Sequence, residues 1–310
     1  MSGAFDLNGK VALVTGGARG IGLAISEELC ARGARVVVAD SGVSISGDAP
    51  DPSVAQSVAE RLGQQAVAFA TDIAAPGAAT DAVTLAVERF GALDIVINNA
   101  AILRDALVFK SQRADWQRVI DNNLTGAWAV LAASTPVLRE AAKSGRSSGR
   151  IVNIVSSAGL YGNFGQSAYA ASKAGLVGLT RVVAMDMARS GVNCNAVAPF
   201  AATRVTSSIQ PANEAQAEYK RRALALPAAY VARLVGWLST PGCAVTGQLF
   251  GVRGREIFLF SQPRPIARVV TEPLDQLTPE RLDAAVTLEL RDQLTDLQTD
   301  LEAFNTEPLI

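Results

Sequence analysis

Tyr169 and Lys173 are the side chains whose types and spacing point most directly to acid–base chemistry. They lie four residues apart in a segment with a helical pattern, so both should project from one face of a helix. A free phenol, with a pKa near ~10, is almost fully protonated at neutral pH, and a nearby ammonium group favours its ionised form. Tyr169 is therefore a candidate general base for oxidation of an alcohol and general acid for reduction of a carbonyl.

Ser156 adds specificity to this pair, because a Tyr-x-x-x-Lys spacing alone is common on exposed helix faces. It follows the apolar run 150–155 and precedes Tyr169 by thirteen residues. A serine hydroxyl there could hydrogen-bond a substrate oxygen and stabilise the charge that develops on it. Ser157 is the alternative donor. Because the sequence contains no histidine, proton transfer must fall to Tyr, Lys, Ser, Cys or a carboxylate.

A glycine-rich turn lies between the apolar run 11–15 and a helical pattern at 22–31. Three residues separate Gly16 from Gly20 and one separates Gly20 from Gly22, which differs from the more common GxGxxG spacing. Glycines permit a tight turn and a close approach of the backbone to a pyrophosphate at the helix N-terminus. The flanking strand and helix favour a dinucleotide site over an ordinary strand–helix connection.

Asp40 ends the next apolar run, 18 residues after Gly22, near the position of an acid that binds the adenosine ribose. Its carboxylate would accept both ribose hydroxyls and repel a 2′-phosphate, which favours NAD over NADP. Arg19 argues the other way, because it could pair with such a phosphate. We weigh Asp40 more heavily, since a negative charge facing a phosphate costs more than a surface arginine gains. A solvated aspartate at a strand end is the simpler alternative.

These candidate residues need a parallel sheet to bring them together. Near-continuous apolar runs that predict strands alternate with helical patterns at 22–31, 53–61, 78–90 and 169–188; the runs are 11–15, 35–39, 66–70, 94–98, 150–155, 191–197 and 256–260. Continuous apolar runs require a sheet covered on both faces, and the alternation implies right-handed βαβ units. The predicted fold class is α/β, a doubly wound parallel sheet of the Rossmann type.

The pattern changes after Phe260, where Pro263 and Pro265 interrupt the chain. Residues 278–304 are typical of a helix that begins at a cap-like Thr-Pro-Glu, with apolar residues at helical spacing. We therefore predict a single NAD-binding domain over residues 1–262 and a helical C-terminal extension over 263–310. The extension is too short to form a core of its own.

Charge and composition exclude several classes of partner. Lys and Arg number 28 and Asp and Glu 29, with no long run of either sign, so we expect neither nucleic acid nor a membrane surface as partner. No apolar run reaches the roughly 18 residues of a membrane span, and residues 1–10 lack the features of a signal peptide. Three scattered cysteines predict no metal site. With no peroxisomal address at residues 307–310, these features favour a cytoplasmic protein.

The chain resembles the short-chain dehydrogenase/reductase family over roughly residues 5–262. The motifs that carry the resemblance stand in the family's order: Thr15-Gly-Gly-Ala-Arg-Gly-Ile-Gly22, Asn98-Asn-Ala-Ala101, Asn123, Ser156 and Tyr169-Ala-Ala-Ser-Lys173. Within the family, stretches 98–105, 159–166, 194–199 and 203–206 are most similar to the (3R)-hydroxyacyl-CoA dehydrogenase part of peroxisomal multifunctional enzyme type 2 and its bacterial relatives. Ala101 and Phe200 depart from the family, which often has glycine at both positions.

The resemblance implies hydride transfer between NAD and a secondary alcohol or ketone. It implies that Ser156, Tyr169 and Lys173 are catalytic and that Asn123 holds a water in a proton relay, with Asn122 as the simpler helix residue. It also implies a set of cofactor contacts: Gly16, Arg19, Gly20, Ile21, Gly22, Asp40, Asp72, Ile73, Asn99, Tyr169, Lys173 and Thr203. Asp72 could equally be a helix cap.

The implied substrate is a small molecule, a 3-hydroxyacyl-CoA in the first place. A hydroxysteroid dehydrogenase and a 3-oxoacyl-(acyl-carrier-protein) reductase are the enzymatic alternatives, and a catalytically inactive dinucleotide sensor or scaffold is the alternative from another class. The family usually forms oligomers, so we expect a homodimer or homotetramer. Apolar residues at helical spacing within 176–188 could pack on a partner, although packing on the chain's own sheet is the simpler explanation. Arg204, Arg221 and Arg222 could meet a nucleotide phosphate or be solvated.

Overall fold

The computed structural model describes residues 5–146, 148–211 and 213–310 of the chain. Two compact units make up the structure. The first comprises Met1–Phe260 together with Thr299–Ile310, and the second comprises Ser261–Gln298. The predicted catalytic and cofactor residues all belong to the first unit.

Within the described residues, the first unit is built on an eight-stranded sheet with the order β3-β2-β1-β4-β5-β6-β7-β8. The strands are β1 (Val11–Thr15), β2 (Arg35–Ala39), β3 (Ala66–Phe69), β4 (Ile95–Asn98), β5 (Arg150–Ile154), β6 (Asn193–Phe200), β7 (Leu249–Arg253) and β8 (Glu256–Leu259). Along this order, each strand from β3 at one edge through β2, β1, β4, β5 and β6 to β7 pairs in parallel with its neighbour. The strand order reverses between β1 and β4, as in dinucleotide-binding sheets, which confirms the predicted fold class.

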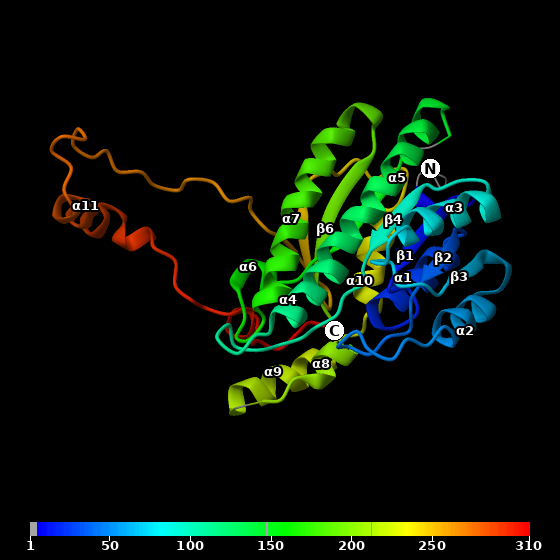
Figure 1. Cartoon of the computed structure of the whole chain (residues 1–310), viewed down its shortest axis with the longest axis horizontal. Helices are drawn as coiled ribbons and strands as arrows, with labels where there is room; N and C mark the ends of the chain where they lie inside the picture. The colour runs from blue at the N-terminus through cyan, green and yellow to red at the C-terminus, as the bar shows by residue number, and fades with distance from the viewer. Residues whose placement is uncertain (1–4, 147, 212) are drawn as a thin grey trace. The chain divides into compact units, whose positions relative to one another are not determined.

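Helices cover both faces of this sheet, as its apolar strands require. The longer helices are α1 (Gly20–Ala31), α2 (Ser53–Leu62), α3 (Ala78–Phe90), α4 (Arg113–Ile120), α5 (Gly126–Lys143), α7 (Ser167–Met187), α9 (Glu214–Leu224) and α10 (Ala229–Leu238). Of the two largest core clusters, one joins the strands to α1, α2 and α10, and the other joins them to α3, α5 and α7. Figure 1 shows α5 and α7 on the near side of the sheet and α1 and α10 behind it.

The edge of the sheet differs from the sequence prediction. Strand β7 was not predicted, because it contains Gly251 and ends at a charged residue. Strand β8 was predicted, but it pairs with β7 in the antiparallel direction. Only Gly254 and Arg255 connect the two strands, and such a short link forms a hairpin and cannot form a parallel crossover.

The apolar stripe of α7 packs on the chain's own core. Leu176, Val183 and Met187 are buried, and Leu179 packs against the same clusters. The stripe is therefore not the partner surface that its spacing could have formed. Val182 and Met185, on another part of the same helix, are the large exposed apolar residues of α7.

The helix predicted over 278–304 forms only in part. Helix α11 (Pro279–Ala285) begins at Thr278, whose side chain accepts a hydrogen bond from the Arg281 backbone N–H. A π turn (Val286–Leu290) and a 3-10 turn (Arg291–Gln293) follow, and the chain is extended at Leu294. A new cap at Thr299 then starts α12 (Asp300–Ala303). Local side-chain hydrogen bonds of this kind compete with a continuous helix, which the apolar spacing alone did not reveal.

Candidate active site

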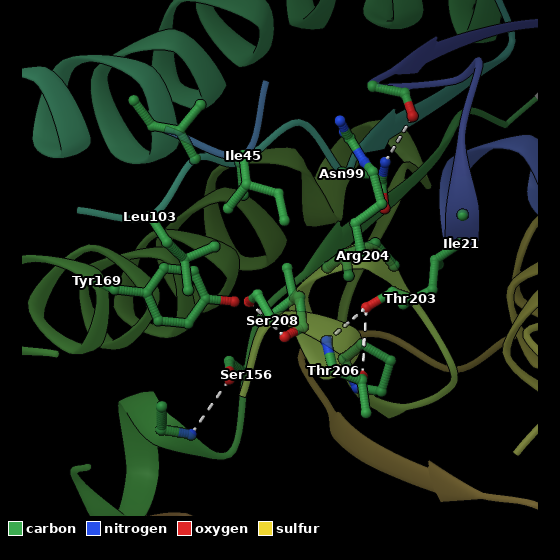
Figure 2. A pocket seen from close by; sticks show the side chains of 18 of the residues that line it. Ile21, Ile45, Asn99, Leu103, Ser156, Tyr169, Thr203, Arg204, Thr206 and Ser208 are labelled. Carbon is green, nitrogen blue, oxygen red and sulfur yellow. Dashed lines mark hydrogen bonds between the residues drawn. The ribbon is translucent and has the colours of Figure 1, made fainter. Parts of the chain in front are cut away.

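A cavity of about 570 Å³ lies at the carboxyl ends of the central strands. Its walls include the residues that follow β1, β2, β4, β5 and β6. Every predicted catalytic and cofactor residue lines it except Asn123. Residues far apart in the sequence therefore meet at the switch point of the sheet, where ligands bind in folds of this class. Figure 2 shows this pocket from close by.

The glycine-rich turn has the geometry of a phosphate cradle. Gly16 and Gly20 have positive φ angles of 62° and 54°, which glycine adopts without strain. A Cβ atom on Gly22 would collide with the Gly16 carbonyl oxygen, so helix and turn can pack this closely only through glycine. Helix α1 starts at Gly20, and no side chain of the described residues caps its first N–H groups. These free donors and the helix dipole fit a pyrophosphate.

Asn99 holds this turn in place. Its Nδ2 donates to the carbonyl oxygens of Thr15 and Gly16, each at 3.0 Å. Its backbone N–H donates to Thr15 Oγ1 at 3.0 Å. The residue after β4 thus fixes the turn after β1, and Asn99 also lines the cavity.

Asp40 and Arg19, whose charges favour NAD and NADP respectively, form an ion pair in the structure. Arg19 Nη2 donates to Asp40 Oδ1 at 3.3 Å and to the Val43 carbonyl oxygen at 2.7 Å. Asp40 Oδ2 accepts a hydrogen bond from the Ala18 N–H at 3.2 Å. Arg204 reaches the same Val43 oxygen at 3.4 Å, and burial is the main cause that lowers its pKa. This corner of the cavity therefore combines one carboxylate with two guanidinium groups.

The remaining predicted cofactor residues lie around the same cavity. Asp72 is exposed, and its Oδ1 accepts a hydrogen bond from the Ala74 N–H in a local turn, while Ile73 is buried. Thr203 caps α8 (Arg204–Ser208) by accepting a hydrogen bond from the Thr206 N–H. Its methyl group would lie 3.7 Å from a Cβ atom on Gly20, so it faces the glycine-rich turn.

Tyr169 points its hydroxyl into the cavity (Figure 2). The pKa of Tyr169 is raised to about 12, mainly by burial; the hydrogen bond with Ser156 acts to lower it, and the charges of Asp105 and Asp300 act to raise it. Ser156 Oγ also accepts a hydrogen bond from the Ala158 N–H at 3.2 Å. In the protein alone, burial thus outweighs the expected lowering of the phenol pKa.

Lys173 lies behind Tyr169 on the same helix. Its side chain is 2% exposed, and its Nζ donates to the Ile154 carbonyl oxygen at 2.7 Å. The ammonium group is 5.8 Å from the centre of the Tyr169 ring. Burial lowers the pKa of Lys173 to about 8, so the ammonium form still dominates at neutral pH.

Asn123 lies behind the cavity wall, in a π turn (Asp121–Thr125) between α4 and α5. Its Oδ1 accepts from the Ile102 N–H at 2.8 Å, and its Nδ2 donates to the Ile102 carbonyl oxygen at 3.0 Å. Nδ2 also lies 3.4 Å from Ser172 Oγ, one residue before Lys173. Asn122, which was expected to point elsewhere, does line the cavity, and its buried Oδ1 has no hydrogen-bond partner among the described residues.

The C-terminal segment, Thr299–Ile310, contributes two cavity residues that were not predicted from the sequence. Asp300 and Leu301 line the cavity. Ser157, the rival candidate for the catalytic serine, donates its hydroxyl hydrogen bond to Asp300 Oδ2 at 2.5 Å. No sequence signal marked this contact, because the partners are 143 residues apart and the aspartate fell within a predicted helix.

Arg221 and Arg222 have a different role from phosphate binding. Both form ion pairs with Glu218 and Glu307. Arg222 Nη1 also donates to the Asn305 carbonyl oxygen at 2.8 Å. These arginines therefore join α9 to the C-terminal segment.

No helix within residues 5–146, 148–211 and 213–310 is both long and apolar enough to cross a membrane.

Comparison with known proteins identifies the family. A model of the short chain dehydrogenases matches residues 10–216. A 3-oxoacyl-[acyl-carrier-protein] reductase of Synechocystis sp. is 38% identical over 251 residues, which cover 80% of this chain and 97% of the relative. A hydroxyacyl-CoA dehydrogenase of Mycobacterium tuberculosis is 37% identical over 262 residues, which cover 83% of this chain and 81% of the relative.

Peroxisomal multifunctional enzyme type 2 of Mus musculus is 31% identical over 280 residues. That match covers 90% of this chain but 36% of the mouse protein, so the chain spans about a third of its length. These matches confirm the resemblance drawn from the motifs. The chain belongs to the short-chain dehydrogenase family, whose members are oxidoreductases that act on CH–OH or keto groups with a nicotinamide dinucleotide.

Proposed function

We propose that this chain uses NAD to oxidise the hydroxyl group of a 3-hydroxyacyl-CoA to a ketone. The observation that carries the proposal is the convergence of Ser156, Tyr169 and Lys173 in one cavity with the glycine-rich turn and Asp40. The three catalytic groups and the glycine-rich turn line the same cavity. This combination fits hydride transfer better than it fits dinucleotide binding without catalysis. A catalytically inactive sensor would not need Ser156 and Tyr169 beside the buried lysine.

Each residue of the site has a defined role in this reaction. Tyr169 accepts the proton of the substrate hydroxyl, and Ser156 hydrogen-bonds the same oxygen as its charge changes. Lys173 places positive charge behind the phenol and can hold a cofactor ribose. When bound, the oxidised nicotinamide accepts a hydride and adds positive charge that favours the phenolate. Asn123 fixes the segment after β4 and the helix turn before Lys173.

The substrate proposal rests on similarity to known enzymes. The hydroxyacyl-CoA dehydrogenase and multifunctional enzyme relatives support a thioester as the substrate. The 38% identical acyl-carrier-protein reductase supports a second candidate, reduction of a 3-oxoacyl group on a carrier protein. A hydroxysteroid is the third, because it presents the same secondary alcohol.

Asp40 supports NAD as the cofactor, because its carboxylate at the end of β2 would bind ribose hydroxyls and repel a 2′-phosphate. Arg19 and Arg204 lie beside it, so their charges are the main argument for NADP. In the Asp40→Ala variant, Arg19 loses its carboxylate partner, so its guanidinium group can pair with a phosphate. The variant should therefore lose efficiency with NAD and gain efficiency with NADP.

The test compares catalytic efficiency for 3-hydroxyacyl-CoA, the matching free acid, the carrier-protein thioester and a 17-hydroxysteroid, each with NAD and NADP. The proposal expects the CoA thioester with NAD to be turned over at least about tenfold more efficiently than the others, a difference of ~1.4 kcal/mol. Equal turnover of the free acid or the steroid would contradict the CoA proposal. Equal efficiency with both cofactors would contradict the role of Asp40.

A further inference from the structure

The C-terminal segment, defined here as Thr299–Ile310, is packed firmly on the body of the first unit. Phe304 lies at the centre of an aromatic cluster, with ring centroids 4.6 Å from Phe200, 5.4 Å from Phe258 and 5.9 Å from Tyr161. Clustered rings of this kind add stabilisation beyond the area that they bury. The cluster fixes α12 beside α6 (Ala158–Tyr161), the short helix that follows the catalytic serine.

Polar contacts fix the rest of this segment. The Arg255 N–H donates to the Leu309 carbonyl oxygen at 2.8 Å, and Arg253 donates to the Thr306 carbonyl oxygen. Glu302 and Thr299 form a capping box that sets the start of α12 and therefore the position of Asp300. The segment thus delivers Asp300 to one defined place in the cavity wall.

Asp300 is a costly residue at that place. It is 6% exposed, and its Oδ2 accepts the hydrogen bond from Ser157. Burial raises the pKa of Asp300, although hydrogen bonds from Ser157 and from the backbone N–H groups of Asp300 and Leu301 lower it. A carboxylate buried in the wall of a site is costly to keep charged, so its presence there calls for a functional explanation.

Ser157 connects that carboxylate to the catalytic serine. It is buried and lies in the turn between β5 and α6, directly after Ser156. The Ser157 carbonyl oxygen accepts hydrogen bonds from the N–H groups of Leu160 and Tyr161. Its side chain and backbone therefore both fix the turn whose first residue hydrogen-bonds Tyr169.

The charge of Asp300 also reaches Tyr169. The charged groups that act on this phenol come from three elements: Lys173 from α7, Asp105 from the segment after β4, and Asp300 from the C-terminal segment. Both carboxylates raise the pKa of Tyr169. Removal of the Asp300 charge should thus make the phenol a stronger acid.

We propose that Asp300 is a positioning residue through which the C-terminal segment holds the catalytic turn: its carboxylate fixes Ser157 and thereby orients Ser156 toward Tyr169 and the substrate. This inference rests on the catalytic roles proposed above. It gives the last residues of the chain a direct effect on the reaction.

The test uses the full-length chain and four variants with the best substrate. Asp300→Ala and Ser157→Ala remove the hydrogen bond, and their double variant tests coupling. Asp300→Asn keeps an acceptor oxygen for Ser157 but removes the charge. Glu307→Gln is the matched control, because it weakens an anchor of the same segment without touching Ser157. Cofactor affinity and thermal unfolding are measured for each variant.

The proposal expects Asp300→Ala and Ser157→Ala each to lower kcat by about tenfold or more, with KM and cofactor affinity less affected. The double variant should be no slower than the slower single variant, as for partners in one interaction. Asp300→Asn should keep most of kcat and move the pH profile of kcat/KM to lower pH. Glu307→Gln should change neither.

Several results would overturn it. These are unchanged kcat in Asp300→Ala, losses that multiply in the double variant, or equal losses in Glu307→Gln. If Asp300→Ala fails to fold, the other two variants decide. Unchanged kcat in Ser157→Ala, or an unchanged pH profile in Asp300→Asn, would then contradict the proposal. A Tyr169→Phe variant separates the two proposals. Retained turnover there contradicts the catalytic assignment, whereas its loss combined with a normal Asp300→Ala contradicts only the role of Asp300.

Discussion

At the scale of single residues, burial moves the proton affinities of Tyr169 and Lys173 in opposite directions. It raises the pKa of Tyr169 to about 12 and lowers that of Lys173 to about 8. In both cases the charged form is disfavoured, because water is replaced by a less polar surrounding. At neutral pH only the Lys173 ammonium group carries this penalty, because Tyr169 stays protonated.

Lys173→Met should stabilise the protein at neutral pH while abolishing turnover. A lysine pKa lowered from 10.5 to about 8 costs about 3 kcal/mol when the group is charged. Since the folded state binds fewer protons than the unfolded state between these values, the penalty is complete below pH ~8 and fades as pH rises toward ~10.5. Loss of the Ile154 hydrogen bond offsets roughly 1 kcal/mol of the gain.

Urea unfolding at neutral and at alkaline pH measures this effect. The variant should gain about 2 kcal/mol near neutrality, and the gain should shrink as pH increases. A variant less stable than the parent at neutral pH would show that the buried ammonium group is compensated in the folded protein.

At the scale of elements, the β1–α1 turn depends on glycine for both packing and binding. A side chain on Gly22 would collide with the Gly16 carbonyl oxygen, which is backbone and cannot move aside cheaply. Gly22→Ala should lower cofactor affinity by at least about tenfold and destabilise the fold by roughly 1–3 kcal/mol. Calorimetric titration with the cofactor and thermal unfolding measure the two effects.

Gly178→Ala is the control for that substitution. Gly178 is exposed in the middle of α7, has open space at its Cβ position and makes an ordinary helical residue. Alanine there should leave cofactor affinity unchanged, because Gly178 does not line the cavity. Its effect on stability is measured together with the oligomeric state, since Gly178 lies one turn before Val182 on α7. Equal affinity of both variants for the cofactor would contradict the phosphate cradle.

The elements that the sequence predicted well are those with a strong local signal. Strands β1 and β2 are mainly β-branched and apolar, and the glycine-rich turn lies between a predicted strand and a predicted helix that both form. Strand β7 and the break of the C-terminal helix had a weaker signal, because β7 contains Gly251 and ends at a charged residue, and local caps at Thr278 and Thr299 interrupt the helix. Asp300 reaches Ser157 only through the docking of the C-terminal segment, and no local pattern encodes that contact.

At the scale of the whole molecule, we predict a homodimer or homotetramer. The predicted stripe on α7 is part of the core, but other apolar side chains on the same side of the sheet remain exposed: Trp128 on α5, and Val182 and Met185 on α7. Exposed apolar groups on neighbouring helices fit an interface between copies of the chain. Sedimentation at micromolar concentration should give at least a dimer, and Met185→Glu should weaken it. A monomer at all concentrations would contradict this.

The most direct test of the central claim, that Tyr169 transfers the proton in a Ser–Tyr–Lys site, is the single turnover of the Tyr169→Phe variant. The substitution removes one hydroxyl group and preserves the ring, so fold and cofactor binding should remain. Rapid mixing with saturating substrate and cofactor then measures the chemical step alone. We predict a loss of several orders of magnitude. Retention of more than about a tenth of the normal rate, a loss below ~1.4 kcal/mol, would contradict the account.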